Sequence, residues 1–245
     1  MKIIGIIPAR YASTRFPGKP LIDIGGKSMI QRVYEQAKKT SSLSGVVVAT
    51  DDARIESHVK SFGGEVVMTS ETHQSGTDRC FEAIQKFSSA ADIVINIQGD
   101  EPFIQPEQID LVASCFDSQE VQIATLVKQI NSEQDLFNVN IPKVVLNTKG
   151  NAIYFSRQTI PFLRGKENTE WLNSHVFYKH IGIYAYRTKV LAEITRLDPS
   201  RLEVSEGLEQ LRWIENGYTI RAKTTDFENV AIDVPDDLKK LTNFL

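Results

Sequence analysis

The most constraining feature of this chain is a regular alternation of short apolar runs with longer amphipathic segments. Apolar runs occupy residues 3–7, 46–50, 66–68 and 93–97, and patterns typical of helices fill the intervals between them. Continuous apolar strands are typical of parallel sheets that are covered on both faces, and strands that alternate with helices indicate βαβ units. We therefore predict an α/β fold with a doubly wound, mainly parallel sheet.

The second half of the chain has a less regular pattern. The predicted elements there are strands at 143–146, 182–186 and 218–222, and helices at 203–215 and 235–245. Neither an internal repeat nor a linker-like composition divides the chain. We expect a single domain over 1–245, with a core of about 1–130 and 215–245 and an inserted lobe of about 131–214.

A loop rich in cations follows the first apolar run. Pro8 is expected to end that strand, and Arg10, Arg15 and Lys19 follow it, interleaved with Ser13. Backbone N–H groups and fixed positive charge at the carboxyl end of a strand suit a polyphosphate. The alternative is a solvated basic loop, which is what most charge clusters are.

Two common nucleotide-binding motifs are excluded. Gly26, Lys27 and Ser28 resemble the end of a P-loop, but that motif needs a glycine where this chain has Leu21. The first strand is not followed by a G-x-G-x-x-G pattern. A nucleotide held by this loop must therefore be held by a different design.

Composition narrows the class of protein further. A formal net charge of −3 argues against a general nucleic-acid binder and favours a small anionic substrate. Cys80 and Cys115 are too few for a disulfide framework and do not have a metal-binding spacing, which fits a reducing cytosol. The apolar runs are too short for a signal peptide or a membrane helix. We expect a cytoplasmic protein that binds neither membrane nor nucleic acid.

Two aspartates are candidates for holding a divalent metal. Asp100 follows the run at 93–97, where Gly99 is expected to allow a sharp turn, and Asp233 follows the apolar residues 230–232, which we predict to be a strand. Each could instead be a helix cap or a turn residue. Carboxylates at two strand ends would suit Mg²⁺, which takes one or two of them together with substrate phosphates.

Further polar residues offer binding groups, each with a structural alternative. In the loop 72–79, Ser75 and Arg79 could contact a base or ribose, or the loop could only cap a helix. His180 heads an apolar strand and could bind a carboxylate or be structural, whereas Glu209 and Gln210 lie on a helix whose polar residues are ordinarily solvated. We identify no Ser–His–Asp or Cys–His pattern that would support covalent catalysis.

In combination, these segments resemble the 3-deoxy-manno-octulosonate cytidylyltransferases of the nucleotide-diphosphosugar transferase superfamily. The resemblance extends over nearly the whole chain. It is carried by IIPARYASTRFPGKPL (6–21), HQSGTDR (73–79), NIQGDEPFI (96–104), PKVV (142–145), YFSRQTIP (154–161), HIGIYAYR (180–187), LEQLR (208–212) and IDVPDDL (232–238).

The resemblance implies specific roles. Catalysis would depend on Arg10, Lys19, Asp100 and Asp233, and the two aspartates would hold Mg²⁺. CTP would contact Ala9, Arg10, Ser13, Arg15, Lys19, Ser75, Arg79 and Gln98. The acidic sugar would contact Arg157, His180, Tyr184, Glu209 and Gln210. Lys179 departs from the family, in which we expect Arg; the change would forfeit a bidentate grip if this residue touches a carboxylate.

The implied reaction joins 3-deoxy-manno-octulosonate (Kdo) to CMP for lipopolysaccharide biosynthesis. The anomeric hydroxyl would attack the α-phosphorus of CTP, and pyrophosphate would leave. Alternatives are the 8-amino analogue or another acidic 2-keto sugar, a related transferase acting on a sugar 1-phosphate, and a catalytically silent nucleotide-binding module. The resemblance also implies a homodimer, for which we place part of the interface on the strand 181–186.

Overall fold

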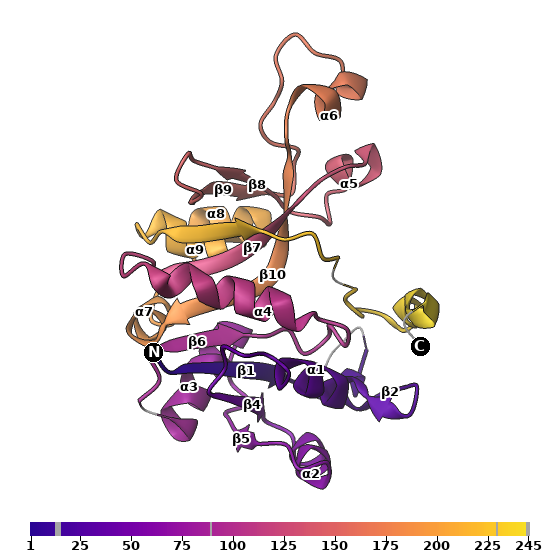
Figure 1. Cartoon of the computed structure of the whole chain (residues 1–245), viewed down its shortest axis with the longest axis vertical. Coiled ribbons are helices and arrows are strands. Elements are labelled where there is room, and N and C mark those ends of the chain that lie inside the picture. The colour runs from indigo at the N-terminus through magenta and orange to yellow at the C-terminus, as the bar shows by residue number, and fades with distance from the viewer. Residues whose placement is uncertain (13–15, 89, 229, 244–245) are drawn as a thin grey trace.

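The computed structural model describes residues 1–12, 16–88, 90–228 and 230–243. Within this part of the chain, a nine-stranded sheet lies between two groups of helices (Figure 1). Its strands are β1 (Ile3–Ala9), β4 (Gly45–Thr50), β5 (Val66–Met68), β6 (Ile93–Asn96), β7 (Ile123–Gln129), β8 (Lys143–Leu146), β9 (Ala152–Ser156), β10 (Tyr178–Arg187) and β11 (Ile220–Thr224). A separate ribbon pairs β2 (Asp23–Ile24) with β3 (Lys27–Ser28).

The helices comprise α-helices and short 3₁₀ segments. The α-helices are α1 (Met29–Ala37), α2 (Ala53–Ser61), α3 (Gly76–Phe87), α4 (Pro106–Ala113), α5 (Glu133–Phe137), α6 (Trp171–Ser174), α7 (Thr188–Ile194), α8 (Arg201–Glu206) and α9 (Gln210–Glu215). The 3₁₀ segments are η1 (Lys19–Leu21), η2 (Ser114–Asp117), η3 (Asn168–Glu170) and η4 (Pro235–Asn243). None of the described helices is long and apolar enough to cross a membrane.

The strand order confirms the α/β prediction and adds an antiparallel element. The order is β11-β7-β10-β6-β1-β4-β5, with β8 and β9 attached through β10. β1 runs parallel to both neighbours, with Ile6 opposite Val47 on β4 and Asn96 on β6. β10 runs antiparallel to β6 and β7. Its apolar run gave no indication of direction, because a buried strand has the same composition in either orientation.

Alternate residues of β1 pack into two cores on opposite faces of the sheet. Ile3 and Ile7 join the core that is covered by α1, α2 and α4. Ile4 and Ile6 join the core that is covered by α3, α7 and α9. This arrangement is the physical reason that the first strand lacks polar alternation.

The first strand extends beyond the predicted end at Ile7. Pro8 pairs with Ala49 inside the strand, which continues to Ala9. The carbonyl of Ile6 accepts a hydrogen bond from Ile97 N–H, so the alternate residue Pro8 faces the same neighbour beyond the end of β6 at Asn96. Its missing N–H therefore costs no ladder hydrogen bond, and proline is tolerated there.

The segment 230–232 is not a strand, contrary to the prediction. It is an irregular connection in which Ile232 N–H donates to Asp100 O at 3.0 Å and the Ile232 side chain is buried with Ile24, Met29 and Leu241. The closing helix begins at Pro235 as expected but has 3₁₀ geometry through Asn243. Asp233 is thus positioned by this hydrogen bond and this packing rather than by a strand.

The strand at 181–186 cannot form the dimer interface that we predicted for it. It belongs to β10, which lies inside the sheet between β6 and β7, and Ile183, Ala185 and Tyr186 are completely buried. Exposed apolar side chains gather instead in the projecting region of α5 and α6 (Figure 1), at Phe137, Val139, Phe162 and Val176.

The predicted helix at 203–215 consists of two helices, α8 and α9, which are separated at Gly207. Gly207 adopts φ 62° and ψ 41°, the left-handed conformation, and its N–H donates to Glu203 O at 2.7 Å. This is a glycine C-cap, which ends α8 and reorients the chain before Glu209. The periodicity of the apolar residues continues across Gly207, so the sequence pattern does not reveal the break between the two helices.

We expect Gly207→Ala to lower the free energy of unfolding by about 1 kcal/mol, because a Cβ is disfavoured in the left-handed conformation. A Cβ there would meet Arg157 Nη2 at 3.8 Å, so crowding should add little. Gly207→Asn is the matched control and should cost less, since Asn tolerates this conformation. Urea unfolding of the three proteins measures both differences; equal stability of the alanine variant and the wild type would contradict the assignment.

Candidate active site

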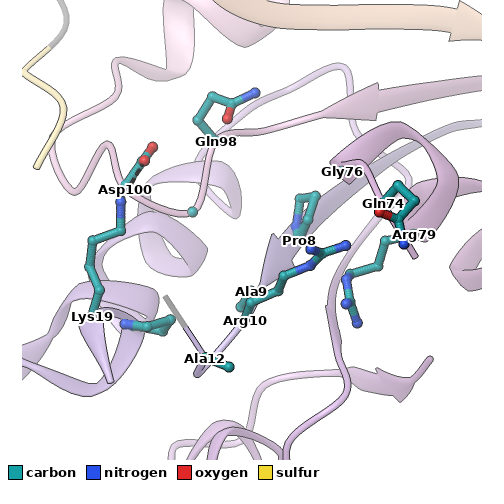
Figure 2. A pocket seen from close by; sticks show the side chains of 12 residues that line it. Pro8, Ala9, Arg10, Ala12, Lys19, Gln74, Gly76, Arg79, Gln98 and Asp100 are labelled. Carbon is teal, nitrogen blue, oxygen red and sulfur yellow. Dashed lines mark hydrogen bonds and ion pairs between the residues drawn. The ribbon is translucent and has the colours of Figure 1, made fainter. Parts of the chain in front are cut away.

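A cleft of about 540 Å³ opens at the carboxyl ends of β1 and β6. Its lining residues are Pro8, Ala9, Arg10, Ala12, Lys19, Pro20, Gln74, Gly76, Arg79, Gln98, Gly99 and Asp100. Figure 2 shows Lys19 meeting Asp100 at one end, with Arg10 and Arg79 toward the other end. The cleft lies where parallel α/β sheets bind ligands. Of the residues predicted to contact CTP, Ser13 and Arg15 lie outside the described part of the chain.

Gly99 is required for close approach rather than for an unusual backbone angle. A Cβ at this position would lie 2.7 Å from the carbonyl oxygen of Pro8, which belongs to the backbone and cannot move aside. The loop after β6 therefore packs directly on the end of β1. This contact brings Asp100 over the loop that carries Lys19.

Two guanidinium groups occupy the other end of the cleft. Arg10 donates a hydrogen bond from Nη2 to the carbonyl of His73. Burial and the neighbouring Arg79 lower the pKa of Arg10, although an arginine keeps its charge in proteins. A polyanion that entered the cleft would relieve this repulsion.

Arg79 supports the cleft wall. Its side chain is completely buried, with Nη2 2.5 Å from Asp51 Oδ2 and Nη1 2.6 Å from Thr69 Oγ1. These contacts use the guanidinium inside the protein, so the predicted contact of Arg79 with a base or ribose stays a prediction. Asp51, which directly follows β4, supplies the counter-charge from a partly buried position.

At the opposite end, one ammonium group lies between the two predicted metal ligands. Lys19 Nζ is 2.8 Å from Asp100 Oδ2 and 3.6 Å from Asp233 Oδ1. Lys19 begins η1 directly after Gly18, whose φ of 72° is left-handed. The structure therefore brings together the two aspartates that the sequence singled out, although they are 133 positions apart, from 100 to 233.

The two carboxylates fit a divalent cation that takes its remaining ligands from a substrate. Within the described residues, no group of three or more His, Cys, Asp or Glu side chains could hold a metal ion unaided. Mg²⁺ typically binds one or two carboxylates together with substrate phosphates and water. The ammonium of Lys19 is a stand-in cation between the same two carboxylates, which shows that they can share one positive charge.

Gln98 and Ser75 border the cleft in different ways. Gln98 Nε2 donates to the carbonyl of Gly182 at 2.8 Å, which leaves Oε1 as an acceptor on the cleft side (Figure 2). Ser75 caps α3: its Oγ accepts from Asp78 N–H at 3.1 Å, and its own N–H donates to Asp78 Oδ2 at 3.2 Å. The capping alternative for Ser75 is thus confirmed.

The residues predicted to bind the sugar lie beside this cleft rather than in its lining. Glu209 accepts a hydrogen bond from Thr77 Oγ1 at 2.9 Å, and Thr77 follows the lining residue Gly76. Burial raises the pKa of Glu209. Gln210 is buried. The aromatic rings of His180 and Tyr184 are 5.1 Å apart.

His180 is a neutral, hydrogen-bonded imidazole. Burial lowers its pKa to about 4. Thr125 Oγ1 donates its hydrogen to the carbonyl of Ile183 at 2.8 Å, so it accepts from His180 Nε2–H at 3.0 Å. A neutral ring cannot form an ion pair with a carboxylate. The structural interpretation of His180 therefore describes this conformation, and its contact with a sugar stays a prediction.

Arg157 is held at the break between α8 and α9. Its Nε donates to Glu206 O at 2.7 Å, Nη1 to Val139 O at 3.3 Å and Nη2 to Gly207 O at 3.4 Å. All three acceptors are neutral carbonyls, so the charge of the guanidinium is available to an anionic ligand. The contact of Arg157 with a sugar carboxylate stays a prediction.

Lys179 contacts carboxylates of the protein itself. Its Nζ is 3.0 Å from Asp135 Oδ2 and 2.6 Å from Glu228 Oε1. A lysine can bridge two acids from different segments as a point charge, so the departure from Arg has a structural role here.

The profile of a family described as cytidylyltransferase matches residues 4–223 of the chain. The chain belongs to the cytidylyltransferase family. It is 62% identical to a 3-deoxy-manno-octulosonate cytidylyltransferase of Parabacteroides distasonis, covering 100% of this chain and 98% of that protein. It is 58% identical to the enzyme of the same name from Bacteroides thetaiotaomicron, with the same coverage of both chains.

Solved structures agree with this family. A CMP:2-keto-3-deoxy-manno-octonic acid synthetase in complex with CTP superposes with a TM-score of 0.92 at 42% identity, covering 100% of this chain and 98% of that one. A 4-diphosphocytidyl-2C-methyl-D-erythritol synthase from Anaerococcus prevotii shares the fold, with a TM-score of 0.65 at 11% identity, covering 99% and 98% of the two chains.

Two residues of this cytidylyltransferase site escaped the sequence argument. Thr77 links the cleft to Glu209, and Asp51 neutralises Arg79. A signal for Asp51 was present, because it follows a buried strand just as Asp100 does. The neighbouring Asp52 has a different role, because it caps α2 and accepts a hydrogen bond from Arg54 N–H.

The protonation of His180 predicts a loss of stability in mild acid. Its folded pKa of about 4 lies below the ordinary value of 6.5, so the unfolded chain binds the extra proton first as the pH falls. The part of the unfolding free energy that depends on a neutral His180 is fully present above pH 6.5 and is lost as the pH falls toward 4. The total loss should be roughly 3 kcal/mol. His180→Gln should remove this part of the profile. Unfolding free energies that change in parallel for both proteins between these pH values would contradict the assignment.

Proposed function

We propose that this cytidylyltransferase transfers CMP from CTP to Kdo and releases pyrophosphate. The observation that carries the proposal is the arrangement of the cleft, which has cations along one loop and two aspartates facing the same space. The relatives that bear this activity in their names match the chain over its whole length. Location in the cytoplasm and a place in lipopolysaccharide biosynthesis stay predictions.

The cleft supports an orientation for CTP. Arg10 and Lys19 would contact the triphosphate, because they are the cations of the loop after β1. Gln98 donates a hydrogen bond from Nε2 to a backbone carbonyl, and this contact orients the amide. Its Oε1, which can only accept a hydrogen bond, remains for a ligand. Cytosine carries an amino group that can donate to it, whereas uracil carries an acceptor at the same position. Gln98 would therefore favour CTP over UTP.

The proposed reaction is an in-line displacement at the α-phosphorus. The anomeric oxygen of the sugar forms the new P–O bond, the bond to the β-phosphate breaks, and the hydroxyl proton passes to solvent. Arg10 and Lys19 would stabilise the charge that grows on the leaving pyrophosphate. The fixed cations would also hold two anionic reactants that otherwise repel each other.

Asp100 and Asp233 would hold the divalent ion, which we propose is Mg²⁺. When bound, such an ion lowers the pKa of the attacking hydroxyl and neutralises charge on the phosphates. Both aspartates can reach one cation without movement of the backbone, as the contacts of Lys19 indicate.

Residues from the predicted lobe of about 131–214 would supply the sugar site, and part of that range, the strand β10, lies inside the central sheet. We propose that Arg157 binds the sugar carboxylate and that His180, Tyr184, Glu209 and Gln210 contact its hydroxyl groups. Glu209 suits a neutral partner because burial raises its pKa. The neutral imidazole of His180 likewise suits a hydroxyl better than a carboxylate. The exposed apolar side chains of the projecting region are the surface that we propose for a homodimer.

Pyrophosphate release tests the activity. With CTP and Mg²⁺, we expect release with Kdo and little with sialic acid, and the 8-amino analogue tests the alternative directly. Asp100→Asn should lower kcat by at least about a hundredfold, because it removes charge that acts in the transition state. Lys27→Met, which alters an exposed ion pair away from the cleft, is the control. Release without any sugar, or none with any of the three, would overturn the proposal.

Arg157→Ala tests the sugar site separately. We expect the KM for the sugar to rise about tenfold or more, because a charge-assisted contact to a carboxylate is lost, while the KM for CTP changes little. Steady-state kinetics with each substrate varied in turn measure the two constants. The control is Arg187→Ala, whose guanidinium donates to carbonyls at the far end of β10. Equal changes in the two KM values would contradict the role of Arg157.

A further inference from the structure

We propose that Lys19 is a displaceable internal cation. Its ammonium lies between the two carboxylates that would hold the divalent ion, and it moves to the phosphates when metal and nucleotide bind. Divalent ions should therefore bind weakly until CTP gives the lysine another anionic partner. This inference rests on the proposed metal-dependent transfer and assigns Lys19 a second role within it.

The contacts make lysine and metal mutually exclusive. Lys19 Nζ lies 2.8 Å from Asp100 Oδ2 and 3.6 Å from Asp233 Oδ1. A divalent ion that shared these carboxylates would lie about 2.0–2.1 Å from their oxygens if it were Mg²⁺. Its charge would then be close to the ammonium, and like charges at that separation repel each other even where solvent screens them in part. The two cations cannot hold these positions at the same time.

The surroundings of the pair make the exchange measurable. The side chain of Lys19 is only 16% exposed, compared with 26% for Asp100 and 47% for Asp233. The contact with Asp100 is therefore shielded from solvent more than the contact with Asp233, and solvent screening weakens an exposed ion pair. A divalent ion must therefore break a substantial interaction before it binds.

Lys19 also has a place to go. It lines the same cleft as Arg10, and its backbone is fixed in η1, while its four-carbon side chain can rotate. The phosphates of a bound nucleotide would attract the ammonium as it leaves the aspartates. Binding of nucleotide and of metal would then each strengthen the other, since such coupling is reciprocal.

The test measures Mn²⁺ binding without any substrate, by electron paramagnetic resonance of the free ion. Lys19→Met keeps the length of the side chain but removes the charge, and we expect Mn²⁺ affinity to rise about tenfold. Lys19→Arg retains a cation that can pair with both carboxylates, so its affinity should stay close to that of the wild type. Lys27→Met is the control for loss of a lysine elsewhere. Circular dichroism verifies that each variant is folded.

A second titration in the presence of CTP, without sugar, tests the release. The wild type should gain more Mn²⁺ affinity from CTP than Lys19→Met does, because only the wild type has a lysine to displace. A titration of Mn²⁺ with CTP in the absence of protein corrects for Mn²⁺ bound to CTP in solution. Unchanged or weaker Mn²⁺ binding by folded Lys19→Met, or equal gains from CTP, would overturn the inference. Because turnover is not measured, failure here is distinguishable from failure of the proposed activity.

Discussion

The contact between Gly99 and Pro8 sets the geometry on which the cleft depends. β1 and β6 are parallel partners up to the pair Ile6 and Asn96, so the loops that follow the two strands begin at the same end of the sheet. Because Gly99 has no Cβ, the loop after β6 can pass directly over the end of β1. Asp100 then lies against Lys19, and Gln98 lies at the border of the same space. A side chain at 99 would separate the two loops and with them the acidic and basic halves of the site.

The cations of the cleft are neutralised to different degrees, and this difference assigns them different tasks. Arg79 is itself completely buried and has a partly buried carboxylate partner, so it is a fixed part of the wall. Arg10 is held by a neutral carbonyl, which orients the guanidinium without cancelling its charge. Lys19 is paired, but its partners are the groups that a metal would claim. A chain with a net charge of −3 can thus present a local positive field to a polyanion.

The sequence was sufficient for the features that depend on local pattern. Buried strands, the capped start of α3 and the acid at the end of β6 follow from apolar runs, capping residues and strand ends. The break at Gly207 could not be found in this way, because the apolar periodicity continues through it. Asp233 does lie beside the same lysine as Asp100, but the predicted strand is absent, and a hydrogen bond and the burial of Ile232 hold the segment instead. The burial of Arg79 and the central position of β10 depend on tertiary packing, which local sequence patterns do not reveal.

Lys19 and Lys179 make the same kind of contact, but we assign them different roles. Lys19 is the displaceable cation that we propose, whereas Lys179 holds two segments of the chain together. Each ammonium bridges two acids that are far apart in the sequence. Burial by itself lowers the pKa of Lys179, but the hydrogen bonds to Glu228 and Asp135 raise it by more. The net effect is a raised pKa, so the ammonium stays charged. Glu228 also pairs with Lys128, which anchors the segment leading to Asp233 on β7 and β10. The contacts of Glu228 hold the residue at which that segment begins, and an exchange of cations at Asp233 would not require these contacts to break.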